Sequence, residues 1–312
     1  MGYNRCALFA ISAKFLGSIY MRDKLVMGAL LLTLVTMTST AVAAPSGSFG
    51  WLGQLGSHRT LVLPATADHS PVITLGTAVD LTTGQTVDGY AIVHYAKGGN
   101  GGGKPGSGGG YALMGAKWKT VEPWLLNPVN TGGLPYDPPG GFGNNNSTPG
   151  SSFAFWNTSY DIDKWEDAAD GVMGNGSGTD ILGDGTETFS TLTADLVAPD
   201  GLNEVYFADV SESGAIAVTI VWGIFSGPPQ NRQLVEWDQV YDDVDYDWST
   251  FGEASKMDFE NIATHELGHS VGLADLYSPA DLEQTMYGYA DFGETKKQTL
   301  ESGDIAGTDK LY

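Results

Sequence analysis

The stretch His-Glu-Leu-Gly-His-Ser-Val-Gly-Leu-Ala-Asp at 265–275 constrains the fold of this chain more than any other feature. His265 and His269 are four residues apart, so on a helix their imidazoles lie one turn apart on the same face and can bind one metal ion. Gly272 predicts the end of that helix, because glycine adopts the left-handed backbone conformation that side chains penalise. Asp275 follows three residues later, where the returning chain can supply a carboxylate oxygen. The stretch therefore predicts a helix that carries a metal centre near its C-terminal end.

Glu266 gives this metal centre its predicted chemistry. It follows the first histidine directly, where its carboxylate can take a proton from a metal-bound water. Zinc accepts imidazole and carboxylate ligands, and catalytic zinc sites keep a position open for water. We therefore predict that His265, His269 and Asp275 bind zinc and that Glu266 is the catalytic base of a zinc peptidase. The alternative is an ordinary helix with two histidines, but the glycine and the carboxylate at fixed offsets make a chance match less credible.

The histidine count bears on the third ligand. The chain has five histidines, and none of them follows His269. Asp275 stands where the longer pattern HExxHxxGxxH has its third histidine. A competing arrangement takes the third ligand from a more distant glutamate, Glu283 or Glu294. We prefer Asp275, because it closes the site directly after the glycine turn.

The composition argues against several classes of partner. The formal net charge is −22 and the isoelectric point is near 4.3, which disfavours binding to nucleic acid or to an anionic membrane. We expect a monomer that acts on a protein or peptide substrate. A secreted calcium-dependent binding or surface protein with a non-catalytic zinc site is the alternative from another class. The acidity and the 43 glycines fit that alternative, but a general base beside an open metal site does not.

Residues 1–43 are predicted to be a secretory signal peptide. A basic start after Met21, which is an alternative first residue, leads into an apolar run at 25–35 and a small-residue cleavage site at 41–43. An uncleaved membrane anchor is the competing interpretation, although the apolar run is short for a span. We therefore expect a secreted, extracellular protein without stable membrane association after signal removal. The single cysteine, Cys6, precedes the predicted cut, so the mature chain would contain no disulfide.

The rest of the chain divides at a glycine-rich stretch. Residues 44–97 contain β-like runs at 71–75 and 90–95, and we interpret this block as a pro-segment or a small β module. Residues 98–110 include nine glycines among thirteen positions, which predicts a flexible linker open to proteolytic cutting. Residues 111–312 then form the predicted zinc metallopeptidase catalytic domain.

Within the catalytic domain, strands and helices follow one another in an α+β arrangement with mostly a single sheet. Asp258 is the predicted N-cap of the helix that carries the histidines. Further helices are expected at 161–169 and 302–311, and strands at 111–118, 203–208, 214–222 and 234–241.

Three further features carry a resemblance to a known family. Met286, in Thr-Met-Tyr-Gly-Tyr at 285–289, follows Asp275 by eleven residues and is similar to a methionine turn. The C-terminal stretch 300–312 and the segment 111–118 also look like the last helix and the first strand of that family. With the zinc motif, they make residues 111–312 resemble the matrixin-like metzincin metallopeptidases. The resemblance implies a twisted, mostly parallel sheet with an antiparallel edge strand, about three helices, and an active-site helix followed by a Met-turn subdomain.

The resemblance also implies cofactors and a mode of substrate binding. It implies Zn2+ and Ca2+, with Asp242, Asp243 and Asp245 near an acidic calcium segment. Residues 215–219 fall where the family has an edge strand, along which an extended substrate pairs through main-chain hydrogen bonds.

Two departures from the family pattern stand out. The third ligand is Asp275 rather than histidine, as in the snapalysin-like peptidases. The predicted mature chain also lacks the thiol that silences matrixin zymogens. If residues 44–97 inhibit, the block must come from steric cover or from one of a few side chains: His58, His69, His94 or Asp68.

Overall fold

The computed structural model describes residues 59–65, 69–98, 109–131, 133–135 and 151–312. All of these residues belong to one compact unit. The predicted signal peptide at 1–43 and linker positions 99–108 lie outside the described residues. In the part of the chain that is described, no helix is both long enough and apolar enough to cross a membrane.

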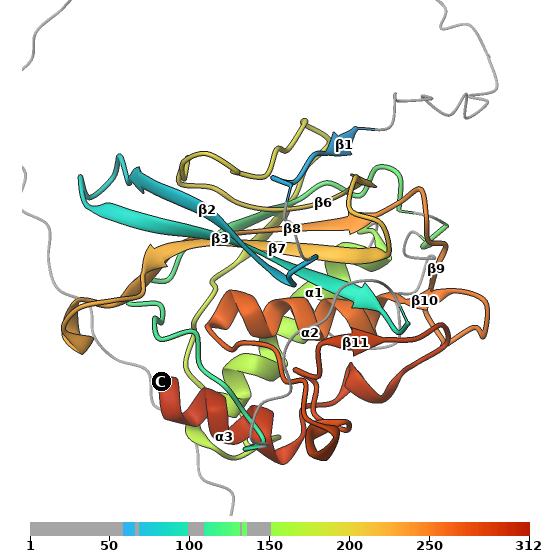
Figure 1. Ribbon diagram of the computed structural model, residues 1–312. Helices are drawn as coiled ribbons and strands as arrows, with labels where there is room; N and C mark the ends of the chain where they lie inside the picture. Colours follow the sequence, from blue (N-terminus) through green and yellow to red (C-terminus); the bar gives the residue numbers. More distant parts are fainter. Residues whose placement is uncertain (1–58, 66–68, 99–108, 132, 136–150) are drawn as a thin grey trace, which may run out of the picture. The chain divides into compact units, whose positions relative to one another are not determined.

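A mixed sheet forms the centre of the fold (Figure 1). Over the described residues it has nine strands in the order β11-β3-β7-β8-β6-β4-β5, with β2 pairing with β3 and β1 with β6. Strands β5, β4, β6 and β8 run parallel, whereas β7, β3 and β2 add antiparallel pairs on the other side. The predicted mostly parallel sheet with an antiparallel edge is therefore confirmed. The strands are β1 (Thr60–Leu61), β2 (Val72–Val79), β3 (Thr86–Ala96), β4 (Trp124–Leu126), β5 (Gly185–Glu187), β6 (Asn203–Val210), β7 (Ala215–Ile224), β8 (Gln233–Asp242) and β11 (Tyr289–Ala290), and β9 (Trp248–Ser249) pairs separately with β10 (Met257–Asp258).

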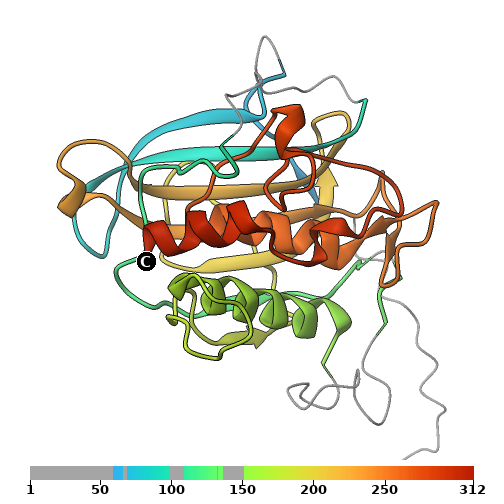
Figure 2. The same ribbon diagram turned by 90° about the horizontal axis from the view of Figure 1, so that it is seen from below.

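The three α-helices lie on one side of the sheet (Figures 1 and 2). They are α1 (Phe153–Asp167), α2 (Phe259–Val271) and α3 (Ser302–Leu311). Helix α1 begins eight residues earlier than predicted, because the hydroxyl of Ser152 caps it by accepting a hydrogen bond from the Phe155 amide at 3.1 Å. The described residues also form four short 3-10 helices: η1 (Ala168–Asp170), η2 (Pro229–Asn231), η3 (Pro279–Asp281) and η4 (Lys296–Gln298).

Helix α2 has the boundaries that the sequence predicts. The Asp258 carboxylate caps its start, accepting a hydrogen bond from the Asn261 amide at 3.0 Å. Gly272 ends the helix with a φ of 110°. A Cβ on Gly272 would also lie only 2.7 Å from the carbonyl oxygen of Ala116, so both backbone conformation and space require glycine.

The sheet separates two hydrophobic cores. The core on the helix side contains large aromatic residues that fix α1 and α2, including Trp165 and Phe259. The Trp165 indole also donates a hydrogen bond to the Thr264 carbonyl of α2 at 2.9 Å. The core on the opposite side draws on strands from both halves of the chain, including Val93 of β3 and Trp222 of β7. Helix α2 is therefore held rigidly against the sheet, as a metal site requires.

The block before the glycine-rich stretch shares this sheet. Strand β3 pairs antiparallel with β7 over Asp88–Tyr95, with His94 opposite Ala217. The expectation that residues 215–219 lie at the edge of the sheet is therefore wrong for this structure, because β3 covers that edge. The division between a block at 44–97 and a domain at 111–312 stays a prediction.

The expected strand at 111–118 is also wrong. That segment makes only an isolated bridge, between Leu113 and Leu273. Its polar groups bond to the end of α2 instead: the Met114 amide donates to the Gly272 carbonyl at 2.9 Å, and the Trp118 indole to the Ser270 carbonyl at 2.7 Å. The apolar alternation in the sequence reflects packing around the helix end rather than sheet pairing.

Candidate active site

Helix α2 presents both histidines of the motif with the same nitrogen free. The imidazoles of His265 and His269 are completely buried. Nδ1 of His265 bonds to the Thr285 carbonyl at 2.7 Å, and Nδ1 of His269 to the Leu273 carbonyl at 2.9 Å. A carbonyl accepts only from a protonated Nδ1, so in the neutral form of each ring Nε2 keeps its lone pair, as a metal ligand must.

Asp275 completes a group of three ligand atoms. Its Oδ1 lies 3.1 Å from Nε2 of His265 and 3.4 Å from Nε2 of His269. All three atoms are buried without a hydrogen-bond partner, which is rare for polar atoms unless an ion or water satisfies them. Tyr277 donates its hydroxyl to the other oxygen, Oδ2, of Asp275 at 2.8 Å. Two imidazoles and one carboxylate converging in this way fit zinc.

The alternative third ligands do not join this group. Among the described residues, the ligand group around His265 contains neither Glu283 nor Glu294. Glu283 is exposed, and Glu294 accepts instead from the Asn261 side chain. The geometry therefore favours Asp275, which was the preferred candidate from the sequence.

Met286 lies directly beneath the helix that carries the histidines. It is fully buried, and a Cβ on Gly268 would come within 2.1 Å of its sulfur. The turn is held in place by Asp304 of α3, which accepts hydrogen bonds from the amides of Thr285 and Met286. The sulfur therefore packs against the backbone of α2 at Gly268, and its role as the floor of a metal site stays a prediction.

Glu266 is buried beside the ligand group. Its Oε2 accepts a hydrogen bond from the Thr219 hydroxyl of β7 at 2.5 Å, and its Oε1 lies 3.0 Å from Nδ1 of His94. Burial raises the pKa of Glu266 to about 7. A carboxyl with a pKa near neutrality suits a group that must accept and return a proton.

His94 reaches this site from strand β3. Its ring packs on that of His265 with centroids 3.9 Å apart, and both His94 and Glu266 have fully buried side chains. Burial, with the positive charges nearby, holds the pKa of His94 well below its usual value, so the ring is neutral. A register shift against β7 falls between His94 and Tyr95, and such bulges re-aim side chains.

A buried lysine lies on the far side of His94. Nζ of Lys297, from η4, is 3.1 Å from Nε2 of His94 and also donates to the Tyr287 carbonyl. Burial lowers the pKa of Lys297 to about 8. The sequence named His94 among possible blocking residues, but it offered no signal for Lys297, which directly follows Lys296 in a short segment without an apolar pattern.

A small apolar hollow opens beside the ligand group. It has a volume of about 210 Å³ and reaches Asp275 between the first block and the loop after β7. Tyr90 and Ile92 of β3 line one side, and Phe225 lines another, with its ring edge-on to Tyr90 at 5.1 Å. Strand β3 therefore forms part of the wall around the candidate active site.

A second group of possible metal ligands lies away from the motif. The carboxylates of Asp195, Glu236 and Asp238 offer oxygens within 4.8 Å of one another. Oε1 of Glu236 is buried without a hydrogen-bond partner. Burial raises the pKa of Glu236 to about 10 and that of Asp238 well above its usual value. Such crowding of buried carboxylates is costly unless protons or a cation neutralise them.

The calcium residues expected from the family pattern are arranged differently. The Asp242 carboxylate accepts hydrogen bonds from the amides of Val210 and Val244, each at 2.9 Å. Asp243 is partly buried and Asp245 is exposed. In the described part of the chain, neither they nor Asp242 form one of the groups whose carboxylates could share an ion. Their calcium role stays a prediction.

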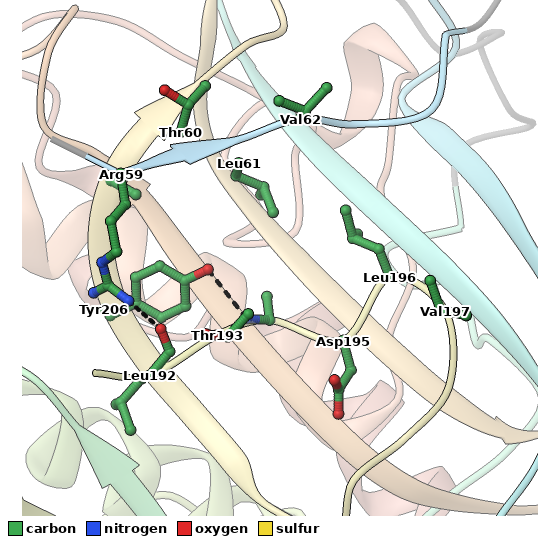
Figure 3. A pocket seen from close by; sticks show the side chains of 12 residues that line it. Arg59, Thr60, Leu61, Val62, Leu192, Thr193, Asp195, Leu196, Val197 and Tyr206 are labelled. Carbon is green, nitrogen blue, oxygen red and sulfur yellow. Dashed lines mark hydrogen bonds between the residues drawn. The ribbon is translucent and has the colours of Figure 1, made fainter. Parts of the chain in front are cut away.

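A further hollow lies on the other face of the sheet (Figure 3). It has a volume of about 540 Å³ between β1 and residues 192–197. The Arg59 guanidinium stacks over the Tyr206 ring at 4.7 Å and donates to the Leu192 carbonyl. This hollow contains none of the residues of the histidine motif.

The structure brings together a buried His–His–Asp group, a glutamate beside it on the same helix and a methionine packed against that helix, which is the arrangement that the metzincin resemblance implies. Comparison with known proteins agrees. Residues 171–312 match the family model of the matrixins. The chain is also 41% identical over 70 residues to matrilysin from Rattus norvegicus, an alignment that covers 22% of this chain and 25% of the relative. Over these residues the chain therefore resembles the matrixin-like metzincins.

Proposed function

We propose that this chain is a secreted zinc-dependent endopeptidase. The observation that carries the proposal is the convergence of three partnerless, buried atoms from His265, His269 and Asp275 beside the Glu266 carboxylate. The chain spans about a quarter of the length of its relative matrilysin. The proposed activity is therefore argued from the geometry of this site and not from the relative. Secretion rests on the signal-like residues 1–43.

Each protein group has a distinct part in hydrolysis. His265, His269 and Asp275 would hold zinc, and the bound ion supplies an acidified water and polarises the scissile carbonyl. Glu266 accepts the proton of the attacking water and passes it to the leaving amine. The Thr219 hydroxyl, which donates to Glu266 at 2.5 Å, orients the carboxylate for that transfer.

We further propose that the chain is latent while β3 pairs with β7. An extended substrate would bind by pairing with β7, and β3 already pairs with β7. His94 occupies the space beside Glu266, with Nδ1 at 3.0 Å. Residues 44–97 therefore act as a pro-segment, and a cut in the glycine-rich residues 98–110 frees β3 to leave. Neither His58 nor Asp68 falls within the described residues, and His69 bonds to Glu212 at 2.6 Å instead.

Calcium is proposed at the cluster of Asp195, Glu236 and Asp238. Calcium prefers oxygen ligands and accepts several carboxylates. Ion binding would satisfy the partnerless Oε1 of Glu236 and remove the repulsion within the cluster. Its role would be structural, because the cluster joins the loop at Asp195 to strand β8.

Metal removal tests the proposed activity. The full chain is allowed to process itself, is stripped with a zinc-selective chelator, and is then given zinc or calcium alone. We expect cleavage of an unfolded protein to be lost on stripping and to return with zinc but not with calcium alone. Cleavage that persists in zinc-free protein would rule out the proposed chemistry. A chain that binds zinc but never cleaves would favour the alternative of a binding protein with a non-catalytic zinc site.

A further inference from the structure

Lys297 is a buried cation without an anionic partner in direct contact. Its side chain is fully buried, and its ammonium contacts only the Tyr287 carbonyl and Nε2 of the neutral His94. Among the described residues, no carboxylate lies within ion-pair distance of Lys297. A buried charge normally has a counter-ion, so this lysine is poised for a negative group that the latent form does not supply.

Strand β3 indicates where that negative group would enter. It lies on β7 in the extended, hydrogen-bonded manner in which a substrate would lie. The residue of β3 opposite Ala217 is His94, and its side chain lies between Glu266 and Lys297. When β3 leaves and a substrate takes its place, the substrate side chain opposite Ala217 faces the Lys297 ammonium.

From this placement we infer that Lys297 is a specificity-determining residue, which selects substrates with an acidic side chain, glutamate above all, at the position opposite Ala217. This inference rests on the proposed peptidase function and on the displacement of β3. Nε2 of histidine and Oε of glutamate are separated from Cα by the same number of bonds. A glutamate carboxylate can therefore reach the place now held by Nε2 of His94, whereas aspartate is one carbon shorter.

The charges around Lys297 leave direct contact with its ammonium as the basis of selection. Glu294, Asp275 and Glu266 act on the ammonium only from beyond ion-pair distance, and Glu294 acts most strongly. Their three negative charges balance those of zinc and Lys297, so the preference for glutamate depends on its direct contact with the ammonium. A lysine or arginine side chain at the same position would instead meet Lys297 and be repelled.

The experiment uses the full chain after it has processed itself. A quenched fluorescent peptide is prepared in versions that carry glutamate, its neutral isostere glutamine, or lysine at each position around the cut bond in turn. The wild type and the variant Lys297→Met are compared by kcat/KM on every peptide. Lys296→Met is the matched control, because Lys296 is the neighbouring lysine and is partly exposed, with Nζ 3.9 Å from Glu294.

We expect one position at which the wild type prefers glutamate over glutamine by about tenfold or more in kcat/KM. Lys297→Met should abolish that preference while glutamine peptides are still cut, Lys297→Arg should keep part of it, and Lys296→Met should keep all of it. A wild type with no glutamate preference at any position would overturn the inference, as would an unchanged preference in Lys297→Met. If Lys297→Met fails to fold, Lys297→Gln gives the same comparison. A wild type that cuts no peptide would instead contradict the proposed function.

Discussion

Removal of the His94 side chain tests how strongly β3 keeps the site closed. The imidazole joins β3 to Glu266 at 3.0 Å and to Lys297 at 3.1 Å, and all of these groups are buried. A hydrogen bond to a charged group contributes about 1.5–3 kcal/mol. At about 1.4 kcal/mol for each factor of ten, loss of the bond to Glu266 should raise the open fraction of the intact chain about 10- to 150-fold.

The measurement is the initial rate at which the intact, zinc-loaded chain cleaves a fluorescent peptide. Intact mass confirms that residues 98–110 are uncut during the assay. His94→Ala should raise this rate within the stated range but leave it below that of the processed enzyme, because β3 still pairs with β7. His69→Ala is the matched control, since that histidine side chain is 49% exposed and contacts Glu212. An unchanged rate in His94→Ala, or an intact wild type as fast as the processed form, would refute the latent role of β3.

Three further predictions concern the His265–His269–Asp275 group, the Asp195–Glu236–Asp238 cluster and the turn at Met286. Elemental analysis should show that Asp275→Ala binds much less zinc than the wild type, whereas Glu294→Ala should bind a normal amount. The reverse result would identify Glu294 as the third ligand. Burial raises the pKa of Glu236 to about 10 in the folded chain. Without a cation, the folded chain therefore favours the protonated carboxyl. This contribution to the free energy of unfolding is complete below about pH 4 and is lost as the pH rises toward 10. The gain in Tm from calcium over a calcium chelator should therefore be larger at pH 8 than at pH 5 and should shrink in Glu236→Gln, and equal gains would contradict the assignment. Met286→Ala should lower the free energy of unfolding by about 2–5 kcal/mol, because it opens a cavity under α2, and denaturant titration of the zinc-loaded protein measures the loss; a loss below about 1 kcal/mol would argue against a packed floor.

The parts of the site that the sequence predicts are those set by short spacing. One helical turn separates His265 from His269, and Gly272 must follow directly for Asp275 to return to them. Asp258, at the start of α2, could likewise be recognised from its own neighbours. In each case the residues that decide the geometry lie within one or two turns of one another.

The parts that the sequence does not predict depend on contacts between distant segments. The glycine-rich residues 98–110 look like a domain boundary, and nothing local indicates that β3 on one side pairs with β7 on the other. Segment 111–118 has the apolar alternation of a strand, yet the Met114 amide and the Trp118 indole bond to the end of α2. Lys297 shows no pattern of its own, since its position matters only because His94 arrives from some 200 residues earlier in the chain.

The acidic cluster was missed for the same reason. In the sequence, Glu236 and Asp238 alternate with apolar residues and look like ordinary polar positions of a strand. Asp195 joins them from a loop that precedes them by some 40 residues. The sequence pointed instead to Asp242 and its neighbours, where Asp242 accepts hydrogen bonds from backbone amides.

Comparing the wild type with Glu266→Ala tests most directly whether Glu266 is the catalytic base of a zinc peptidase. Both full-length proteins are loaded with zinc and cut by an added protease within residues 98–110, and each is then incubated with an unfolded protein while intact mass is followed. We expect that both proteins contain zinc, that the wild type cleaves the substrate, and that Glu266→Ala does not. Cleavage by Glu266→Ala at the wild-type rate would contradict the assignment of Glu266 as the catalytic base, and with it the proposed mechanism.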